Sequence, residues 1–210
     1  MVLLTPDQFL GFLMASLLIT LSPGPDNLMV LSMGASRGRR LGVAFGLGCG
    51  LGCLSHTLLA ALGISALIAA SPWAFAVLKV VGGAYLVYLG VLALRSTGGM
   101  QPPQNAGGDA SVWRVFGKGL FANAINPKVV MFFLAFLPQF VDNGRGGAPW
   151  QIAQLGVIFT VQAALLFGAL GFFAGQVGGW LHRNASAGLW LDRIAGAVFV
   201  GLGVKLLIGL

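Results

Sequence analysis

Long uncharged stretches, broken by short polar or basic turns, dominate the pattern of this chain. No charged residue occurs over 41–78 or over 146–182. Because about 20 helical residues cross the hydrocarbon core of a bilayer, each of these two stretches is longer than one crossing. With breaks placed at Pro, Gly and Trp residues, the pattern predicts six transmembrane helices. They cover residues 8–36, 41–69, 72–95, 114–138, 150–180 and 189–209.

The connections between these predicted helices differ in character. The basic turn Ser36–Arg40 joins the first two helices, and Ser71-Pro72 separates the second from the third. Residues 96–113 are rich in Gly, Pro, Gln and Asn and form the main linker, while 143–149 form a second loop. We therefore expect a single transmembrane domain made of three parts: a three-helix unit over 1–95, a polar linker over 96–113 and a second three-helix unit over 114–210.

Composition supports a protein that is embedded in a membrane. Of the 210 residues, 57% are hydrophobic and 8% are charged, whereas a soluble domain carries about 25% charged residues. A soluble enzyme, a nucleic-acid-binding protein and a disordered protein are therefore excluded, and the expected fold class is all-α and integral to the membrane. The formal net charge of +7 comes from Lys and Arg that lie mainly between the apolar stretches. Because loops rich in Lys and Arg face the cytoplasm, we expect both termini to face outward.

The two three-helix units resemble each other in sequence. The segment Gly42–Phe45 resembles Gly156–Phe159, and Lys79–Tyr85 resembles Arg193–Phe199, with the same spacing of 114 positions in both cases. Because three is an odd number of crossings, the second unit enters the membrane with the opposite orientation. This predicts an inverted 3+3 repeat, which is the layout of many secondary transporters. Chance similarity between apolar helices is the alternative.

The first and the fourth predicted helices are interrupted well inside their apolar stretches. Each interruption contains a capping residue followed by proline, Ser22-Pro23 in the first helix and Asn126-Pro127 in the fourth, and this order is typical of a helix start. We therefore expect both helices to stop and restart within the membrane, which leaves N–H groups that favour an anionic ligand. Paired interruptions in the two halves of a transporter point to its binding site, and simple proline kinks are the alternative.

The expected substrate-binding residues are those of the two interruptions. They are Ser22, Pro23, Gly24, Pro25, Asp26, Asn27, Asn123, Asn126, Pro127 and Lys128. Asp26 and Lys128 carry most of this hypothesis, because an ionisable residue inside a membrane segment is costly and by default functional. We expect Lys128 to attract a substrate carboxylate, and Asp26 to face the substrate ammonium group or to carry a coupled proton. A purely structural ion pair between the two is the alternative.

A second hypothesis concerns Cys49, Cys53 and His56, which share one face of the second predicted helix. Soft ligands on one stripe can bind a transition metal, so a metal-ion or thiol-redox membrane transporter is an alternative function. A fourth ligand is not apparent and the two cysteines do not form a Cys-x-x-Cys pair, so we expect no metal site and no cofactor. The chain also lacks a nucleophile elbow, a Walker loop and a His-Glu-x-x-His motif, so we expect no enzymatic activity.

Glycine recurs every four residues from Gly34 to Gly50 and from Gly171 to Gly179. Small residues at this spacing allow helices to pack closely in lipid. We expect these stripes to serve packing within one chain first, and they leave a homo-oligomer open.

Three groups of residues resemble a known family. Ser22-Pro23-Gly24-Pro25, the stretch Leu78–Gly90, and Phe121–Lys128 followed by Phe136–Phe140 resemble the LysE/RhtB superfamily of amino-acid exporters, in order and spacing over nearly the whole chain. The resemblance implies a six-helix, multi-pass protein of the bacterial inner membrane that expels small amino acids at the expense of the proton gradient. Its implied partners are a small amino acid, protons and the lipid bilayer. The pattern is closer to the homoserine, threonine and leucine exporters than to exporters of basic amino acids, and it gives no role to the cysteine pair.

Overall fold

The computed structural model describes residues 2–64, 71–96 and 111–208, and every regular element in these ranges is helical. The prediction of an all-α protein is therefore confirmed. The main helices are α1 (Pro6–Leu21), α2 (Pro25–Arg37), α3 (Arg39–Leu59), α5 (Pro72–Leu94), α6 (Val112–Ala124), α7 (Pro127–Met131), α8 (Ala148–Phe172), α9 (Ala174–Arg183) and α10 (Ala185–Ile208). Short π-helical and 3-10 segments follow some of them: η1 (Ala60–Ile64), η2 (Phe132–Phe136), η3 (Leu137–Phe140) and η4 (Asn143–Arg145).

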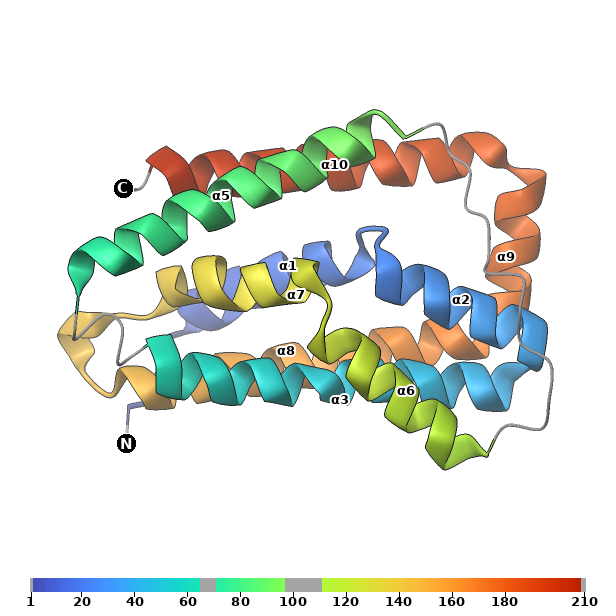
Figure 1. The fold of residues 1–210 in the computed structure, drawn as a ribbon, viewed down its shortest axis with the longest axis horizontal. Helices are drawn as coiled ribbons and strands as arrows, with labels where there is room; N and C mark the ends of the chain where they lie inside the picture. The colour runs from blue at the N-terminus through green and yellow to red at the C-terminus, as the bar shows by residue number, and fades with distance from the viewer. Residues whose placement is uncertain (1, 65–70, 97–110, 209–210) are drawn as a thin grey trace.

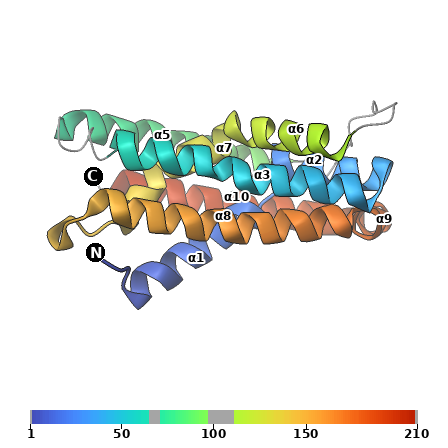
Figure 2. The same cartoon turned by 90° about the horizontal axis from the view of Figure 1, so that it is seen from below.

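Two antiparallel helix pairs form opposite sides of the bundle, α3 with α8 and α5 with α10 (Figure 1). The bent segments α1–α2 and α6–α7 contact both pairs. Figure 2 shows the same bundle from below, with α3 and α8 running side by side along its length. Helix α1 begins and helix α10 ends at the left end of Figure 1, whereas the turn between α2 and α3 lies at the right end. The start of α1 and the end of α10 therefore lie at the same end of the bundle.

Close backbone contact explains why glycine is so abundant in α3. Gly42 lies so near α8 that an added Cβ would come within 2.6 Å of the carbonyl oxygen of Gly171. The predicted packing role is therefore confirmed for Gly34, Gly42, Gly46 and Gly50 of the first stripe, but not for Gly38, which lies in the turn between α2 and α3 and meets no described atom within 4 Å. It is wrong for the end of the second stripe, because Gly175 and Gly179 belong to α9 and an added Cβ at either position meets no described atom within 4 Å.

Several described helices are long and apolar enough to cross a bilayer. Three qualify on their own: Arg39–Gly63, Ala76–Leu94 and α8. The pair α1–α2 and the pair formed by α6 with Pro127–Phe140 also qualify when each is taken as one span, at bends of 57° and 48°. The described residues thus provide three spans or up to five, which indicates a multi-pass membrane protein. Length and composition do not confirm the predicted sixth span.

The helices expected over 8–36 and 114–138 are each divided at their break, so the predicted interruptions are confirmed. The helix expected over 150–180 needs correction, because it ends at Phe172. The chain then continues as α9, which lies across the end of the bundle (Figure 1). Helix α9 contains Gln176, His182 and Arg183, so it is less suited to the hydrocarbon than α8. The predicted linker lies largely outside the described residues, and α6 begins at Val112, inside its expected range.

All five tryptophans are exposed, from 42% of the side chain's accessible surface for Trp150 to 80% for Trp113. Each lies close to the end of a helix. Indole rings prefer the headgroup level of a bilayer, where one part of the ring is in contact with lipid and the N–H with water. Their exposure therefore fits a belt at the two membrane surfaces.

Candidate functional site

The two helix breaks meet near the middle of the bundle (Figure 1). Lys128, just after the second break, donates a hydrogen bond to the backbone of Ser22 in the first break. Asn123, just before the second break, donates to Asp26 at the start of α2. The structure therefore brings the predicted residues of both breaks together, although they are about 100 positions apart in the sequence.

Two prolines shape the first break. Pro23 and Pro25 each disfavour the helical conformation in the residue before them, and both Ser22 and Gly24 are extended. Helix α1 ends at Leu21, and α2 starts at Pro25 with Gly24 as a cap that supplies no side-chain hydrogen bond. The prediction that Ser22 caps a helix starting at Pro23 is therefore wrong, because the second proline delays the restart by two residues.

The second break forms as the sequence predicts. Asn126 caps α7, and its side-chain oxygen accepts a hydrogen bond from the backbone N–H of Lys128 at 3.0 Å. Pro127 is the first helical residue, where its missing N–H costs nothing. Asn126 and Pro127 thus hold the backbone so that Lys128 faces the first break.

The Lys128 ammonium group is buried, with 5% of the residue exposed, and lies against the end of α1. Its Nζ donates to the backbone oxygens of Ser22 at 2.9 Å and Ile19 at 3.1 Å, and to Oδ1 of Asn27 at 3.5 Å. The carbonyl groups at a helix C-terminus carry partial negative charge and attract a cation. This contact offsets the unfavourable position of Lys128 in the first turn of its own helix.

Gly24 makes this approach of Lys128 possible. A Cβ on residue 24 would lie 2.7 Å from Nζ and 3.1 Å from Cε of Lys128. The backbone of Gly24 is extended, so its conformation alone does not require glycine. Space for the lysine side chain is therefore the physical reason for glycine at this position.

Asp26 occupies a separate buried position, with 1% of the residue exposed. Its Oδ2 accepts a hydrogen bond from Nδ2 of Asn123 at 2.7 Å. Asn123 is held in turn by Cys53, whose thiol lies 3.4 Å from the amide oxygen, and by His56, whose Nε2 lies 3.0 Å from the backbone oxygen. In the described part of the chain no ion pair joins Asp26 to Lys128. The structural ion pair considered from the sequence is therefore not formed.

A cavity of about 490 Å³ lies between the breaks and the α5–α10 pair. Six of the ten predicted site residues line it: Pro23, Gly24, Pro25, Asn126, Pro127 and Lys128. The other four, Ser22, Asp26, Asn27 and Asn123, do not line it. The remaining polar lining comes from α5 and α10 and includes Tyr85, Ser96 and Asp192.

Four buried polar atoms around the breaks have no hydrogen-bond partner among the described residues. They are Ser22 Oγ, Asp26 Oδ1, Asn126 Nδ2 and Gln162 Oε1. Buried polar groups in proteins are nearly always satisfied, so a cluster of unsatisfied groups is typical of a site that binds water or a ligand. The unpaired groups include both donors and acceptors, as a zwitterionic ligand requires.

Asp192 lines the cavity although it is not among the predicted site residues. Its Oδ2 accepts a hydrogen bond from Ser96 Oγ at 2.5 Å, which joins α10 to the end of α5. A single carboxylate next to Arg193 in an apolar stretch was the available signal. That signal does not reveal that α10 packs along α5 and so places Asp192 at the cavity.

Gln162 was also left out of the predicted site. The structure places it behind the first break, where its Nε2 donates to Thr20 Oγ1 at 2.9 Å. A polar residue in a long apolar helix was the signal, but the direction in which it faces depends on the packing of α8 against α1.

The metal hypothesis gains no support. The described residues contain no group of three His, Cys, Asp or Glu side chains that could hold a metal ion. Cys49 and Cys53 are both buried and not joined in a disulfide. Cys53 and His56 instead contact Asn123, the hydrogen-bond partner of Asp26.

Comparison with known proteins gives a consistent result over the length of the chain. Residues 17–210 match the family described as LysE type translocator. An uncharacterised membrane protein of Pseudomonas aeruginosa is 35% identical over 203 residues, which cover 95% of this chain and 94% of that protein.

Two further relatives carry functional names. A threonine efflux protein of Escherichia coli is 31% identical over 209 residues, covering 95% of this chain and 97% of the relative. A homoserine/homoserine lactone efflux protein of Salmonella typhimurium is 29% identical over 206 residues, covering 97% of each chain. No solved structure matches this chain.

Proposed function

The chain belongs to the LysE type translocator family, and from this premise we propose that it is a secondary transporter that exports small amino acids from the cytoplasm in exchange for protons. The relatives named for threonine efflux and for homoserine efflux support this class of substrate. The observation that carries the proposal is the cavity at the two breaks, into which the bundle presents the Lys128 ammonium group. A buried cation beside an open cavity suits the carboxylate that all amino acids share.

The cavity offers complementary contacts for both ends of a zwitterion. Lys128 and the unpaired Nδ2 of Asn126 are donors for a carboxylate. The hydrogen bond from Lys128 to Asn27 is long, at 3.5 Å, so a substrate carboxylate would replace a weak contact. Asp192 supplies a carboxylate for the substrate ammonium group. This assignment departs from the expectation that Asp26 faces the ammonium group, because Asp26 does not line the cavity.

The aromatic lining suits a small side chain. Phe199 and Tyr85 face the same cavity as Lys128, and Nζ of Lys128 lies 5.9 Å from the centroid of the Phe199 ring. The volume of about 490 Å³ falls within the range of small-molecule sites. The apolar part of the wall, which includes Leu89 and Leu92, would contact the side chain of the amino acid.

Asp26 is the proposed carrier of the coupled proton. It is buried and does not line the cavity, and its Oδ1 has no hydrogen-bond partner among the described residues. A second cavity, of about 10 Å³, is lined by Thr20, Asn123 and Lys128. A space of this size is about that of one water molecule. A water there would link Lys128 at the substrate cavity to Asn123, which is hydrogen-bonded to Asp26.

The arrangement of the cavity supports loading from the cytoplasm. The cavity extends from the breaks to Ser96, at the end of α5 and beside Arg95. The same end of the bundle holds the α2–α3 turn with Arg37, Arg39 and Arg40 (Figure 1). Because basic loops face the cytoplasm, this end is the proposed cytoplasmic end, and both termini then face outward.

Helix packing supports the proposed inverted 3+3 repeat. On α3 and α8, Gly42 packs against Gly171 and Thr57 packs against Gly156. Residue 156 follows residue 42 by 114 positions, and residue 171 follows residue 57 by the same number. The operation that superimposes one three-helix unit on the other would therefore convert the contact 42–171 into the contact 156–57. Between these contacts, Gly50 packs against Ala164, a pair that is itself separated by 114 positions.

The second helix pair has the same symmetry. On α5 and α10, Gly83 packs against the backbone of Gly203, and Gly90 packs against the backbone of Gly196. The centre of these two contacts falls between residues 86 and 87 on α5 and between residues 199 and 200 on α10, a separation of 113 positions that is within one residue of the first pair's 114. Two independent helix pairs therefore support one pseudo-two-fold relation between units 1–95 and 114–210. With α10 counted as a span, this repeat has six spans.

An efflux assay tests the proposed function. Proteoliposomes are preloaded with single amino acids and diluted into medium at the same or at lower pH. We expect small neutral amino acids such as threonine and homoserine to leave, and an acidic exterior to accelerate their efflux. Lys128→Gln should slow this efflux at least about tenfold, since a charge-assisted bond to a carboxylate contributes about 1.5–3 kcal/mol.

Lys205→Gln is the matched control, because Lys205 is exposed near the end of α10 and does not line the cavity. It should transport as the wild type does. Absence of efflux for every amino acid in the panel would contradict the proposed export. Efflux that does not respond to the pH gradient would contradict only the proton coupling.

A further inference from the structure

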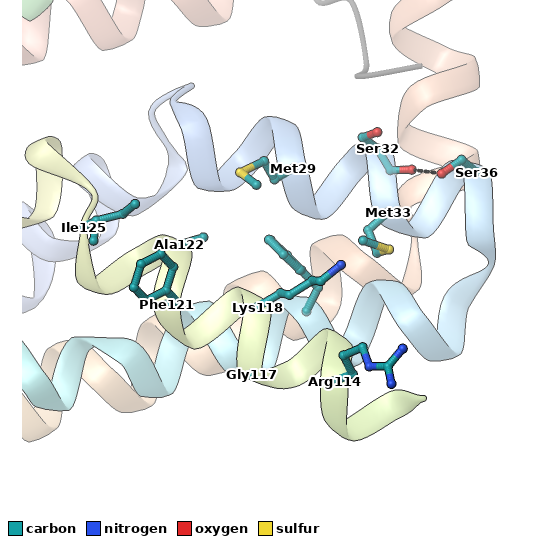
Figure 3. Close-up of a pocket in the computed structure, with 11 residues that line it drawn as sticks. Met29, Ser32, Met33, Ser36, Arg114, Gly117, Lys118, Phe121, Ala122 and Ile125 are labelled. Atoms are coloured by element: carbon teal, nitrogen blue, oxygen red, sulfur yellow. Dashed lines mark hydrogen bonds between the residues drawn. The ribbon is translucent and has the colours of Figure 1, made fainter. Parts of the chain in front are cut away.

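A third cavity, of about 670 Å³, lies between α2 and α6 (Figure 3). Phe45 of α3 also lines this cavity. It is separate from the proposed substrate site, since the two cavities share no lining residue. Helices α2 and α6 each pack on α3 but have little contact with each other. The cavity is thus a groove between two half-helices.

The walls of the groove are apolar along most of its length. Met29, Met33, Phe121, Ala122 and Ile125 line it, and Figure 3 shows from which of the two helices each comes. Phe121 is 65% exposed and Ile125 is 62% exposed. Such exposed apolar side chains in a membrane protein face lipid rather than water.

One end of the groove is cationic. Arg114 and Lys118 lie one turn apart on α6 and both line the groove, opposite Ser32 and Ser36 of α2 (Figure 3). No Asp is among the lining residues, and in the described part of the chain neither cation forms an ion pair. Trp113, which is 80% exposed, directly precedes Arg114. Indole rings favour the headgroup level, so the two cations lie at that depth.

We propose that this groove binds one anionic phospholipid, with its phosphate between Arg114 and Lys118 and an acyl chain along the apolar wall. Arg114 and Ile125 are eleven positions apart, which corresponds to about 16 Å along a helix and matches much of an acyl chain. A basic pocket between transmembrane helices on the cytoplasmic side is typical of anionic lipid binding. A soluble anion would satisfy the cations but would leave the apolar wall uncovered.

Lipid retention measured by native mass spectrometry tests this proposal. The protein is purified in detergent and incubated with phosphatidylglycerol or phosphatidylcholine of the same chain length. We expect one phosphatidylglycerol to stay bound per chain and phosphatidylcholine to be lost. Because each basic residue near an anionic headgroup contributes about 1 kcal/mol, Arg114→Gln and Lys118→Gln should each weaken retention about fivefold, and the double variant about 30-fold.

Arg40→Gln provides the matched control. Arg40 is exposed at the same end of the bundle and carries the same charge, but it does not line the groove. Retention of phosphatidylglycerol should be unchanged in this variant. An equal loss in Arg40→Gln would show general attraction to the basic surface and would overturn the proposal.

A second variant tests the apolar part of the groove while keeping both cations. Ala122→Phe places a ring among the lining residues, and it should reduce retention without altering elution of the protein as a folded particle. Inorganic phosphate should not compete with the lipid. Competition by phosphate alone would indicate a soluble anion site. Equal retention of both lipids, or a lipid-free dimer that dissociates in Ala122→Phe, would likewise overturn the proposal.

Discussion

The Lys128 ammonium group occupies the space that a side chain on Gly24 would need, since a Cβ on residue 24 would lie 2.7 Å from Nζ. In the first break, Gly24 leaves this space open because it has no side chain. In the second break, Lys128 supplies the ammonium group that fills the space. Both are required to place a positive charge at the wall of the 490 Å³ cavity. The two halves of the chain thus build one site from different chemical parts.

Substitution Gly24→Ala should displace this ammonium group while the protein stays folded. The atoms that the new methyl group meets are the end of a flexible side chain, so Lys128 can move away at little cost. Its hydrogen bond to Ser22, now 2.9 Å, should lengthen. We expect the KM for amino-acid export to rise several-fold with little change in thermal stability. Gly178→Ala is the control, because an added Cβ there meets no described atom within 4 Å.

Asp192→Asn should weaken substrate binding without affecting the contact between α5 and α10. Asparagine retains an oxygen that accepts the hydrogen bond from Ser96, now at 2.5 Å, but it lacks the charge that an ammonium group needs. Charge-assisted hydrogen bonds contribute about 1.5–3 kcal/mol, so the KM measured in the efflux assay should rise about tenfold or more. An unchanged KM would exclude Asp192 from recognition of the ammonium group.

The positions of the helix breaks could be predicted from the sequence because proline acts locally. Pro127 and Asn126 form the expected helix start. The first break differs from the prediction because Pro25, two residues after Pro23, keeps Gly24 extended and moves the start of α2. Local rules for proline were therefore sufficient to find each break. They were not sufficient to place the start of α2, where Pro23 and Pro25 act on neighbouring residues.

The partners of the charged residues could not be predicted in this way. Asp26 and Lys128 lie near each other, yet Asp26 contacts Asn123 whereas Lys128 contacts the end of α1. Asp192 reaches the cavity only because α10 packs along α5. These relations depend on which helix faces meet, and local sequence rules do not specify that.

The close contact of α3 with α8 gives a stability prediction. A Cβ on Gly50 would lie 2.6 Å from the backbone nitrogen of Ala164, and backbone atoms at a helix contact cannot move aside easily. We expect Gly50→Ala to lower the stability of the detergent-solubilised protein by about 1–3 kcal/mol, the usual cost of overpacking. Gly201→Ala on α10, where an added Cβ meets no described atom within 4 Å, should be neutral or slightly stabilising. Thermal unfolding of both variants checks this prediction, and equal melting temperatures would contradict it.

Substitution Asp26→Asn should separate substrate movement from proton coupling. Asparagine has nearly the size of aspartate and retains an oxygen for the hydrogen bond from Asn123, now at 2.7 Å, but it cannot release or take up a proton. Asp26 does not line the substrate cavity, so binding should change little. We therefore expect exchange of labelled for unlabelled amino acid, which needs no proton gradient, to continue near the wild-type rate. Export against a concentration gradient, driven by an acidic exterior, should stop.

The control for this last experiment is Asp7→Asn, which removes the same charge from an exposed position in the first turn of α1. It should leave both exchange and uphill export unchanged. If Asp26→Asn also drove uphill export at the wild-type rate, the proton would be carried by another group. Asp26 would then serve only to hold Asn123 in place through their hydrogen bond. Loss of exchange together with uphill export, in a variant that still folds, would instead place Asp26 in the substrate-binding step, because uncoupling alone does not slow exchange.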